Sequence, residues 1–319
     1  MLRPILRQGI GLLSSRRATG KLLVLTYHRV LETYDAIINE IDAVQFTQQM
    51  ETLAEYFNVI SLAEGVERLQ AGTLAAGSVC ITFDDGYRDN VDVALPILDA
   101  LDLPATFFVA TGYLGNGIMW NDVIIESMRK TSLQQLDLRE FDFGIQAINT
   151  ESQRIQVVDM LLGKWKYKTV KERDQLARRL QELAEVKLDQ RIMMTEQEVK
   201  ELSNAGMEIG GHTINHPILA VTELSEAIKQ IRDCKRELET IINKPVRFFA
   251  YPNGRIGKDY LNEHLTAVKE AGYLAALTTN DGYISHDADL YELPRVSVNH
   301  TSKFKFGASL ARGYVQYGS

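Results

Sequence analysis

The stretch Ser78-Val79-Cys80-Ile81-Thr82-Phe83-Asp84-Asp85-Gly86 joins a short apolar run to two adjacent aspartates and a glycine. A run of this length, rich in β-branched and aromatic residues, predicts a buried strand. Cys80 lies inside the run, where we expect a buried thiol. Asp-Asp-Gly is also good turn chemistry, because glycine accepts positive φ. The two carboxylates therefore follow the strand directly, and a plain turn is the competing interpretation.

Similar apolar runs lie on both sides of this strand and alternate with helical patterns. The predicted strands are 22–27, 79–83, 105–109, 208–211, 246–251, 274–278 and 293–298. The predicted helices are 44–56, 89–101, 222–242 and 260–272. This alternation predicts an α/β chain built from βαβ units, with about seven strands. The spacing alone does not distinguish a closed barrel from an open doubly wound sheet.

Residues from about 120 to 195 interrupt the alternation of strands and helices, because they are charged, helix-rich and poor in strand patterns. The strand rhythm resumes after them, so we interpret them as a helical insertion and not as a separate domain. The domain that contains the insertion is expected to span residues 21–305. Residues 306–319 are then a C-terminal tail.

The first twenty residues differ from the rest in charge, since they carry four arginines and no acidic residue precedes Glu32. Apolar residues recur at helical spacing from Leu2 to Leu13. This basic amphipathic segment fits a helix packed on its own domain, or one lying on an anionic membrane surface. A secretion signal fits least, because no apolar run approaches an h-region in length. We expect a cytoplasmic protein without a transmembrane helix, and residues 1–17 are its candidate peripheral contact with the inner membrane.

Composition narrows the class of protein. Of the 319 residues, 45% are hydrophobic and 24% are charged, as in soluble globular enzymes and unlike disordered chains. A net charge of -7 gives no support for a nucleic-acid partner. Two cysteines, Cys80 and Cys234, are too few for a disulfide framework, which is compatible with a reducing compartment.

A second polar cluster, His212-Thr213-Ile214-Asn215-His216-Pro217, follows the predicted strand 208–211. Two histidines at this spacing converge on one ion in a helical turn or a compact loop, and a surface turn closed by proline is the alternative. Two imidazoles and one carboxylate form a common metal site that leaves room for water and substrate. Asp85, His212 and His216 are therefore predicted to hold one divalent cation. Asp84 would stay unligated and ionised beside it, as a general base requires.

At this point the sequence resembles a known family. Thr82-Phe83-Asp84-Asp85-Gly86 and His212 to Pro217 resemble the first two motifs of polysaccharide deacetylases, the NodB-homology or carbohydrate esterase family 4 enzymes. Phe249-Ala250-Tyr251-Pro252-Asn253-Gly254 occupies the place of the third motif. The resemblance covers roughly residues 22–298, apart from the insertion. It implies a distorted (β/α) barrel, one divalent ion that is zinc or else cobalt or nickel, and removal of N-acetyl groups from amino sugars.

Carried over residue by residue, Asp84 matches the catalytic base of the family. Asp85, His212 and His216 match its three metal ligands. The metal would polarise the acetyl carbonyl and acidify the attacking water, and Asp84 would take the proton. The main-chain N–H of Asn253 would help to hold the oxyanion.

Other positions depart from the family pattern. Ala250 stands where the third motif usually has an arginine that orients the base, and Asn253 stands where tyrosine is usual. The fourth motif is not recognisable in residues 278–282. The general-acid histidine of the fifth motif has no clear match, although His300 lies in about the right region. Arg295 is a candidate to replace the missing arginine, with strand-end packing or a surface ion pair as the alternative.

Further residues are candidates for contacting the substrate. His28 follows the first predicted strand and would either line the site or make a structural hydrogen bond. Aromatic side chains stack on sugar rings, although they more often serve packing. The aromatic candidates are Tyr87, Tyr113, Trp120 and Tyr251.

The leading hypothesis is a metal-dependent hydrolase that removes N-acetyl groups from an amino sugar in a polysaccharide or a lipid-linked glycan. Its expected partner is therefore an N-acetylated glycan. One alternative is an amidohydrolase of the same fold that acts on a non-carbohydrate C–N bond. The other is a non-catalytic carbohydrate-binding protein on a degenerate deacetylase scaffold.

Overall fold

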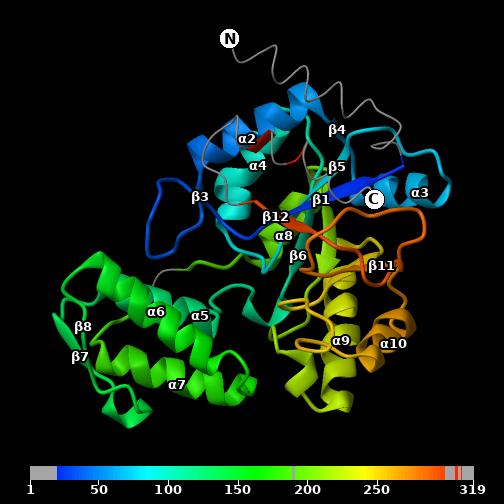
Figure 1. The fold of residues 1–319 in the computed structure, drawn as a ribbon. Coiled ribbons are helices and arrows are strands. Elements are labelled where there is room, and N and C mark those ends of the chain that lie inside the picture. Colours follow the sequence, from blue (N-terminus) through cyan, green and yellow to red (C-terminus); the bar gives the residue numbers. More distant parts are fainter. Residues whose placement is uncertain (1–19, 189–190, 299–305, 308–309, 311–319) are drawn as a thin grey trace.

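The computed structural model describes residues 20–188, 191–298, 306–307 and 310. At its centre lies a curled, parallel sheet (Figure 1). Its main path runs through β11 (Ala275–Leu277), β10 (Phe248–Ala250), β9 (Glu208–Gly211), β6 (Thr106–Val109), β5 (Ser78–Phe83), β1 (Leu22–Tyr27) and β12 (Val296–Ser297). The short β4 (Asn58–Val59) pairs with the first residues of β5. The predicted α/β fold class with about seven strands is therefore confirmed.

The two outer strands of this path are brought together by the segment before β12. Leu293 forms an isolated parallel bridge with Leu277 of β11, and Val296 pairs with Leu25 of β1. Between these two contacts, the Arg295 N–H donates to the Asn280 carbonyl at 3.0 Å. The curl gathers the carboxyl ends of the strands around one mouth, as in a barrel.

Helices flank the sheet, and their apolar faces contribute to its core. These helices are α2 (Ala43–Tyr56), α3 (Leu62–Gln70), α4 (Leu95–Ala100), α8 (Glu196–Asn204), α9 (Leu224–Ile242) and α10 (Asn262–Glu270). The helix predicted over 89–101 is divided, because a π-helical turn, η1 (Asn90–Ala94), precedes α4. Pro96 lacks the N–H that a regular helix would direct at Asp92, which accounts for the wider turn.

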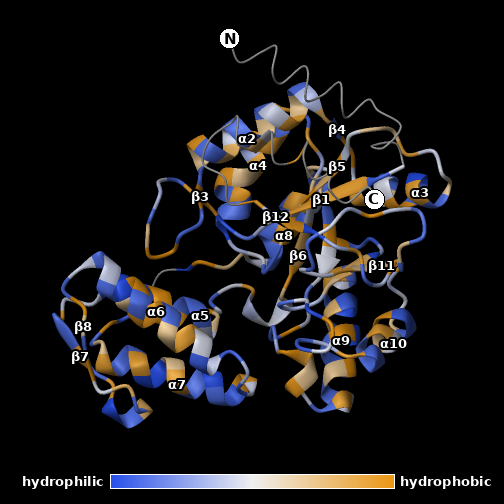
Figure 2. Ribbon diagram, in the orientation of Figure 1, coloured by the Kyte–Doolittle hydropathy of each residue, from blue (hydrophilic) through white to orange (hydrophobic). Residues whose placement is uncertain are grey.

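The core beneath the mouth of the sheet is aromatic. The rings of Phe83 and Phe107 stack with centroids 4.7 Å apart, and Tyr27 lies 5.5 Å from Phe83 on its other side. Figure 2 shows the corresponding hydrophobic colouring along the strands and more polar colouring on the helices around them. Because Asp84 follows Phe83 directly, this packing fixes where β5 ends and where the next loop begins. The thiols of Cys80 and Cys234 are buried and free.

Residues of the predicted insertion form a lobe beside the sheet, drawn in green in Figure 1. It contains α5 (Trp120–Lys130), α6 (Glu151–Trp165), α7 (Val170–Leu183) and a hairpin of β7 (Gln135–Asp137) and β8 (Ile145–Ala147). The lobe has an apolar core of its own, and each of its helices contributes to that core: Ile124 from α5, Leu161 from α6 and Leu180 from α7. Capping boxes at Thr150 and Thr169 define the starts of α6 and α7.

Two short strands, β2 (Val30–Leu31) and β3 (Ile41–Asp42), pair separately near the mouth of the sheet. Among the described residues, no helix is long and apolar enough to span a bilayer. The predicted basic helix at residues 1–17, His300 and most of the tail at 306–319 lie outside the described residues.

Candidate metal centre and catalytic site

The loop after β5 turns its two aspartates in different directions. The Asp84 N–H donates to the Tyr27 carbonyl at 3.0 Å, so Asp84 continues the sheet. Asp85 then adopts a left-handed conformation with φ of 77°, and Gly86 follows with φ of 92°. A Cβ on Gly86 would lie 3.1 Å from Val109 Cγ1, so glycine is favoured here by space and by conformation. The two neighbouring carboxylates thus have different partners, Arg295 for Asp84 and His212 for Asp85.

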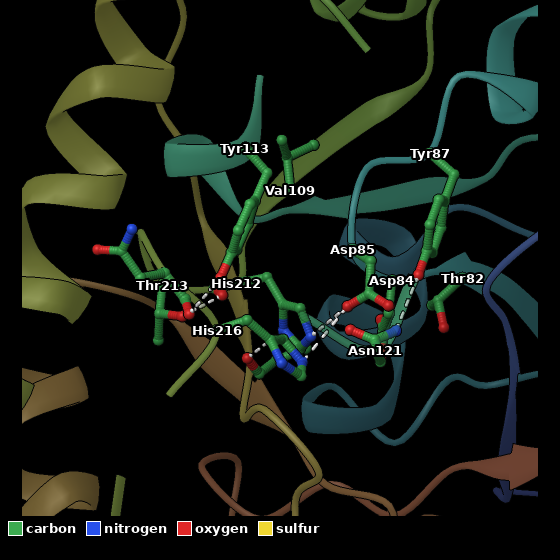
Figure 3. A network of polar contacts seen from close by, with 12 residues as sticks. Thr82, Asp84, Asp85, Tyr87, Val109, Tyr113, Asn121, His212, Thr213 and His216 are labelled. Atoms are coloured by element: carbon green, nitrogen blue, oxygen red, sulfur yellow. Dashed lines mark hydrogen bonds and ion pairs between the residues drawn. The ribbon is translucent and has the colours of Figure 1, made fainter. Parts of the chain in front are cut away.

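The loop after β9 holds its histidines in a strained backbone. Thr213 and His216 have φ of 66° and 45°, and a β-branched residue rarely adopts this region. The Gln230 side chain of α9 accepts hydrogen bonds from the N–H groups of Ile214 and Asn215, at 3.1 and 2.8 Å. Strain of this kind persists only where the surrounding contacts enforce it. Here those contacts direct both imidazoles toward Asp85 (Figure 3).

Asp85, His212 and His216 converge on one point. Their potential ligand atoms all lie within 4.8 Å of one another. Asp85 Oδ1 is 3.3 Å from His212 Nε2 and 3.4 Å from His216 Nε2. His212 Nδ1 lies 2.7 Å from the Ala250 carbonyl, which places a proton on Nδ1 and a lone pair on Nε2.

This arrangement fits a divalent cation. With its proton on Nδ1, His212 presents a lone pair to Asp85 Oδ1, which is itself buried and has no hydrogen-bond partner among the described residues. Facing acceptors repel one another unless a cation lies between them. Burial first, and then nearby His212 and Arg173, lower the pKa of His216 to about 3, although the negative charge of Asp85 acts to raise it. The imidazole is therefore neutral at physiological pH, the form that binds metal.

Asp84 is held by a buried arginine. Both terminal nitrogens of Arg295 lie 2.7 Å from the two carboxylate oxygens of Asp84. Arg295 Nε donates to the Thr278 carbonyl at 3.0 Å, so the guanidinium is fixed from behind. Burial acts to raise the pKa of Asp84, but Arg295 and His212 outweigh it and hold that pKa below its usual value. Asp84 thus remains ionised, and the pair is buried, not at the surface.

The arginine reaches Asp84 from a different strand than the family pattern suggests. Ala250, which occupies the usual arginine position, contributes its carbonyl to His212 instead. Arg295 comes from the segment that closes the sheet between β11 and β12. The sequence offered Arg295 as a candidate, and the structure brings it into bidentate contact.

A cavity of about 390 Å³ lies over these residues. On the barrel side it is lined by His28, Glu40, Asp84, Asp85, His212, His216, Asn253 and Thr279. Asn253 has φ of 60°, and the Thr279 hydroxyl donates to its carbonyl. The Asn253 N–H donates to no acceptor among the described residues. It is therefore available to a ligand in the cavity.

His28 lies at the carboxyl end of β1, in the same cavity. Burial alone would lower its pKa, but Asp85, Glu40 and Asp84 outweigh burial and raise it. Burial raises the pKa of Glu40, and His28 opposes that rise. Glu40 carries no motif, and its place near His28 depends on the pairing of β2 with β3, so sequence reasoning missed it.

The insertion supplies the opposite wall of the cavity. Its lining residues are Trp120, Asn121, Asp122, Ile125, Leu162, Gly163, Lys166 and Arg173. Tyr87, after β5, donates its hydroxyl to Asp122 at 3.1 Å. Burial first, and then the negative charge of Asp85, raise the pKa of Asp122 to about 7. Of this wall, only Trp120 was a candidate from the sequence.

Two aromatic candidates lie away from the cavity. Tyr251 is fully buried, stacks on Tyr260 with ring centroids 4.0 Å apart, and does not line the cavity. Tyr113 is buried beneath the histidine loop, where its hydroxyl donates to the Asn215 carbonyl at 3.0 Å. The Tyr113 hydroxyl is thus held by the histidine loop, whereas the buried Tyr251 hydroxyl has no hydrogen-bond partner among the described residues.

Comparison with known proteins shows which protein family this chain is similar to. A family model described as polysaccharide deacetylase matches residues 71–276. The polysaccharide deacetylase YxkH of Bacillus subtilis is 31% identical over 106 residues, which is 33% of this chain. That match spans 37% of the length of the relative.

Solved structures share the fold along nearly the whole chain. Deacetylase PplD of Streptococcus pyogenes, in complex with acetate, superposes with a TM-score of 0.60 at 21% identity, covering 94% of this chain and 98% of its own. IcaB of Ammonifex degensii gives a TM-score of 0.60 at 19% identity, covering 92% and 97%. At these identities the likeness shows a common fold alone.

Proposed function

We propose, from the premise that this chain belongs to the polysaccharide deacetylase family, that it is a metal-dependent hydrolase of N-acetyl groups on an amino sugar in a glycan. Members of the family are hydrolases that act on carbon–nitrogen bonds other than peptide bonds. One observation carries the proposal: three ligand atoms converge within 4.8 Å beside an ionised, arginine-held Asp84. A water activated at this point would attack an acyl carbon.

Asp85, His212 and His216 would hold the ion, leaving positions open for water and substrate. Two imidazole nitrogens and one carboxylate oxygen suit zinc, and they also accept cobalt or nickel. When bound, the ion supplies Lewis-acid polarisation of the acetyl carbonyl and lowers the pKa of the attacking water.

The side chains of the protein then move the protons. Asp84 accepts a proton from the attacking water, while Arg295 fixes both of its oxygens in place. The free N–H of Asn253 donates to the oxygen that gains charge as the carbonyl becomes tetrahedral. As the C–N bond breaks, the departing amine takes a proton and the acyl group leaves as acetate.

We assign that last proton transfer to His28, because it lines the cavity together with Asp84. Asp85, Glu40 and Asp84 raise the pKa of His28 and favour its protonated form. A bound ion would offset the charge of Asp85, but Glu40 would still act on the imidazole. His300, the candidate from the sequence, lies outside the described residues.

The proposal extends to location. A cytoplasmic protein that contacts the inner membrane through residues 1–17 would act on a lipid-linked glycan or a cytosolic precursor. Deleting residues 1–17 should then shift the protein from the membrane fraction to the soluble fraction. Unchanged recovery with membranes would refute this contact.

The test of the function is acetate release from N-acetylated sugars by metal-stripped protein, before and after addition of zinc, cobalt or nickel. We expect release only with metal, and a fall of about 100- to 10,000-fold in kcat for Asp84→Asn, the usual contribution of a general base. Asp99→Asn, which changes an exposed aspartate on α4, is the matched control and should keep full activity. Full activity of Asp84→Asn would refute the mechanism. Tight binding of one metal per chain without acetate release would favour another amide substrate or a binding role.

A further inference from the structure

Arg173 of α7 is a buried cation with no carboxylate in contact, and Asp174, the next residue in the chain, acts on it only electrostatically. It is 1% exposed and lines the cavity over the candidate metal centre. Among the described residues, no carboxylate oxygen lies within 4.0 Å of its guanidinium, and its buried Nε has no hydrogen-bond partner. A buried charge in this state is unfavourable unless something else in the site neutralises it.

The other two arginines that reach this region differ from Arg173. Arg295 makes its bidentate contact with Asp84, and Arg29 Nε lies 2.8 Å from Asp89. Both therefore have a carboxylate partner within the protein. Arg173 has no carboxylate in contact within the described part of the chain.

Two contacts hold Arg173 in place without neutralising it. Its Nη2 donates to the His216 carbonyl at 3.0 Å. Its guanidinium lies 5.2 Å from the centre of the Trp120 ring, which supports a cation weakly. Because His216 is a candidate metal ligand, Arg173 lies next to the place where the acetyl group would react.

A second cation lies at the rim of the same cavity. Lys166 is half-buried just after α6, and Asp259, Lys258 and Arg255 from the loop after β10 act on it electrostatically, Asp259 by attraction and the other two by repulsion. Tyr167 donates its hydroxyl to Asp259 at 3.1 Å, which joins the insertion to that loop. The insertion wall therefore contributes two cations, Arg173 and Lys166, to the cavity of a protein whose net charge is -7.

We propose that Arg173, with Lys166 at the rim, binds an anionic group on the N-acetylated sugar, either a phosphate or a carboxylate. This inference rests on the function proposed above and adds the charge of the substrate to it. A guanidinium presents its N–H donors as a planar fork that suits both kinds of anion. The insertion would then select the substrate, while the barrel end carries out the reaction.

The test compares a neutral sugar with charged relatives that carry the same acetyl group. The full chain, loaded with zinc, is assayed for acetate release from N-acetylglucosamine, its 1-phosphate, its 6-phosphate and N-acetylmuramic acid. We expect KM for at least one charged sugar to be about 10- to 100-fold lower than for the neutral sugar, the range of a charge-assisted hydrogen bond. Whether the phosphates or the carboxylate give this preference identifies the anion.

Variants separate anion binding from a purely structural role. Arg173→Gln should raise KM for the preferred charged sugar to that of the neutral one, because the contact with the anion is lost. Arg173→Lys should keep part of the preference, because it keeps the charge. Arg178→Gln changes an exposed arginine on the same helix and should behave as the wild type.

Two results would overturn the inference. One is a wild-type protein that does not distinguish charged from neutral sugars. The other is an equal loss for all sugars in Arg173→Gln and Arg173→Lys, which would mean that Arg173 only supports His216. If no sugar releases acetate, the proposed function fails, and calorimetric titration with the same sugars still decides this point. Tighter binding of a charged sugar that Arg173→Gln abolishes would support it, and equal or absent binding would reject it.

Discussion

The two walls of the cavity are built differently. Apart from Glu40, the barrel wall consists of residues in the loops that follow parallel strands, and the ladder of the sheet positions those loops. The insertion wall consists of helical residues that are directed by a separate apolar core. The barrel wall brings together the groups suited to hydrolysis, whereas the insertion wall brings together charge. A fold can therefore keep its chemistry and change its substrate by changing the insertion.

Backbone strain follows the same division. Nine non-glycine residues among those described have positive φ, and four of them, Asp85, Thr213, His216 and Asn253, belong to the loops of the barrel wall. No lining residue of the insertion wall is among the nine. Strain at functional loops persists where surrounding contacts enforce it. The barrel wall is thus set in one geometry, and the insertion wall has ordinary helical backbone.

The largest expected difference between the walls is in metal affinity. Asp85→Asn removes the charged ligand, so we expect zinc affinity to fall by at least about 100-fold, more than the loss of an outer-shell partner. Lys166→Gln on the insertion wall should leave zinc affinity within about 2-fold. Titration calorimetry on metal-stripped protein measures both. Equal losses would show that the two walls do not divide their tasks in this way.

Stability should differ next. Arg295→Met leaves the Asp84 carboxylate buried and unpaired, and we expect the free energy of unfolding to fall by about 3–5 kcal/mol. The matched change on the insertion is Arg179→Met, which removes exposed ion pairs with Glu140 and Glu182 and should leave the free energy of unfolding nearly unchanged. Urea denaturation at neutral pH measures both losses.

The pH dependence checks the cause of that loss. The pKa of Asp84 lies below its ordinary value of 3.8 in the folded protein, because Arg295 and His212 outweigh burial. The stabilisation by the Asp84–Arg295 pair is therefore fully present above pH 3.8, the pKa of Asp84 in the unfolded chain. It is lost as pH falls through the lower pKa of Asp84 in the folded protein. In Arg295→Met, burial acts on Asp84 without the guanidinium and raises its pKa, so the gap between wild type and variant should shrink as pH falls, beginning above pH 3.8 and continuing below it. A gap that is small at neutral pH, or that grows in acid, would contradict the pairing.

The sequence predicted the strands of the central sheet better than the short strands outside it. The bounds of β1 and β9 match the predicted ranges, because apolar runs between turn residues are a strong signal. The short strands β2, β3, β4, β7 and β8 carry no periodicity and were missed, whereas the equally short β10, β11 and β12 lie within longer apolar runs and were predicted. The helix α8 was also missed, although Thr195 and Glu198 form a capping box that signals its start.

The same contrast holds for the site. Asp84, Asp85, His212 and His216 could be found from the sequence, because each lies in a short motif at the end of a strand. Arg295 could only be a candidate, since its contact with Asp84 depends on how the sheet curls. Arg173 has no local signal at all. Its role comes from a helix packed far from the motifs, and from the absence of an ion pair with any carboxylate among the described residues.

The smallest expected effect concerns Asp122 on the insertion wall. Its folded pKa is raised from 3.8 to about 7, chiefly by burial and also by the charge of Asp85. The folded protein therefore binds more protons than the unfolded chain between these values, and wild-type stability falls as pH rises through them. An amide at this position cannot ionise, so Asp122→Asn should gain about 2–3 kcal/mol over wild type between about pH 5 and pH 8, at about 1.4 kcal/mol per pKa unit.

Urea denaturation of metal-stripped protein at the two pH values measures this gain, with the exposed Asp159→Asn on α6 as control. Adding zinc should reduce the gain, because the ion offsets the charge of Asp85 and so removes one of the causes of the shift. The barrel wall would then be influencing the protonation of the insertion wall across the cavity. A gain that is independent of zinc would assign the shift to burial and the charge of Glu126, without a contribution from Asp85. The absence of a pH-dependent gain would show that Asp122 is already ionised when the protein is folded.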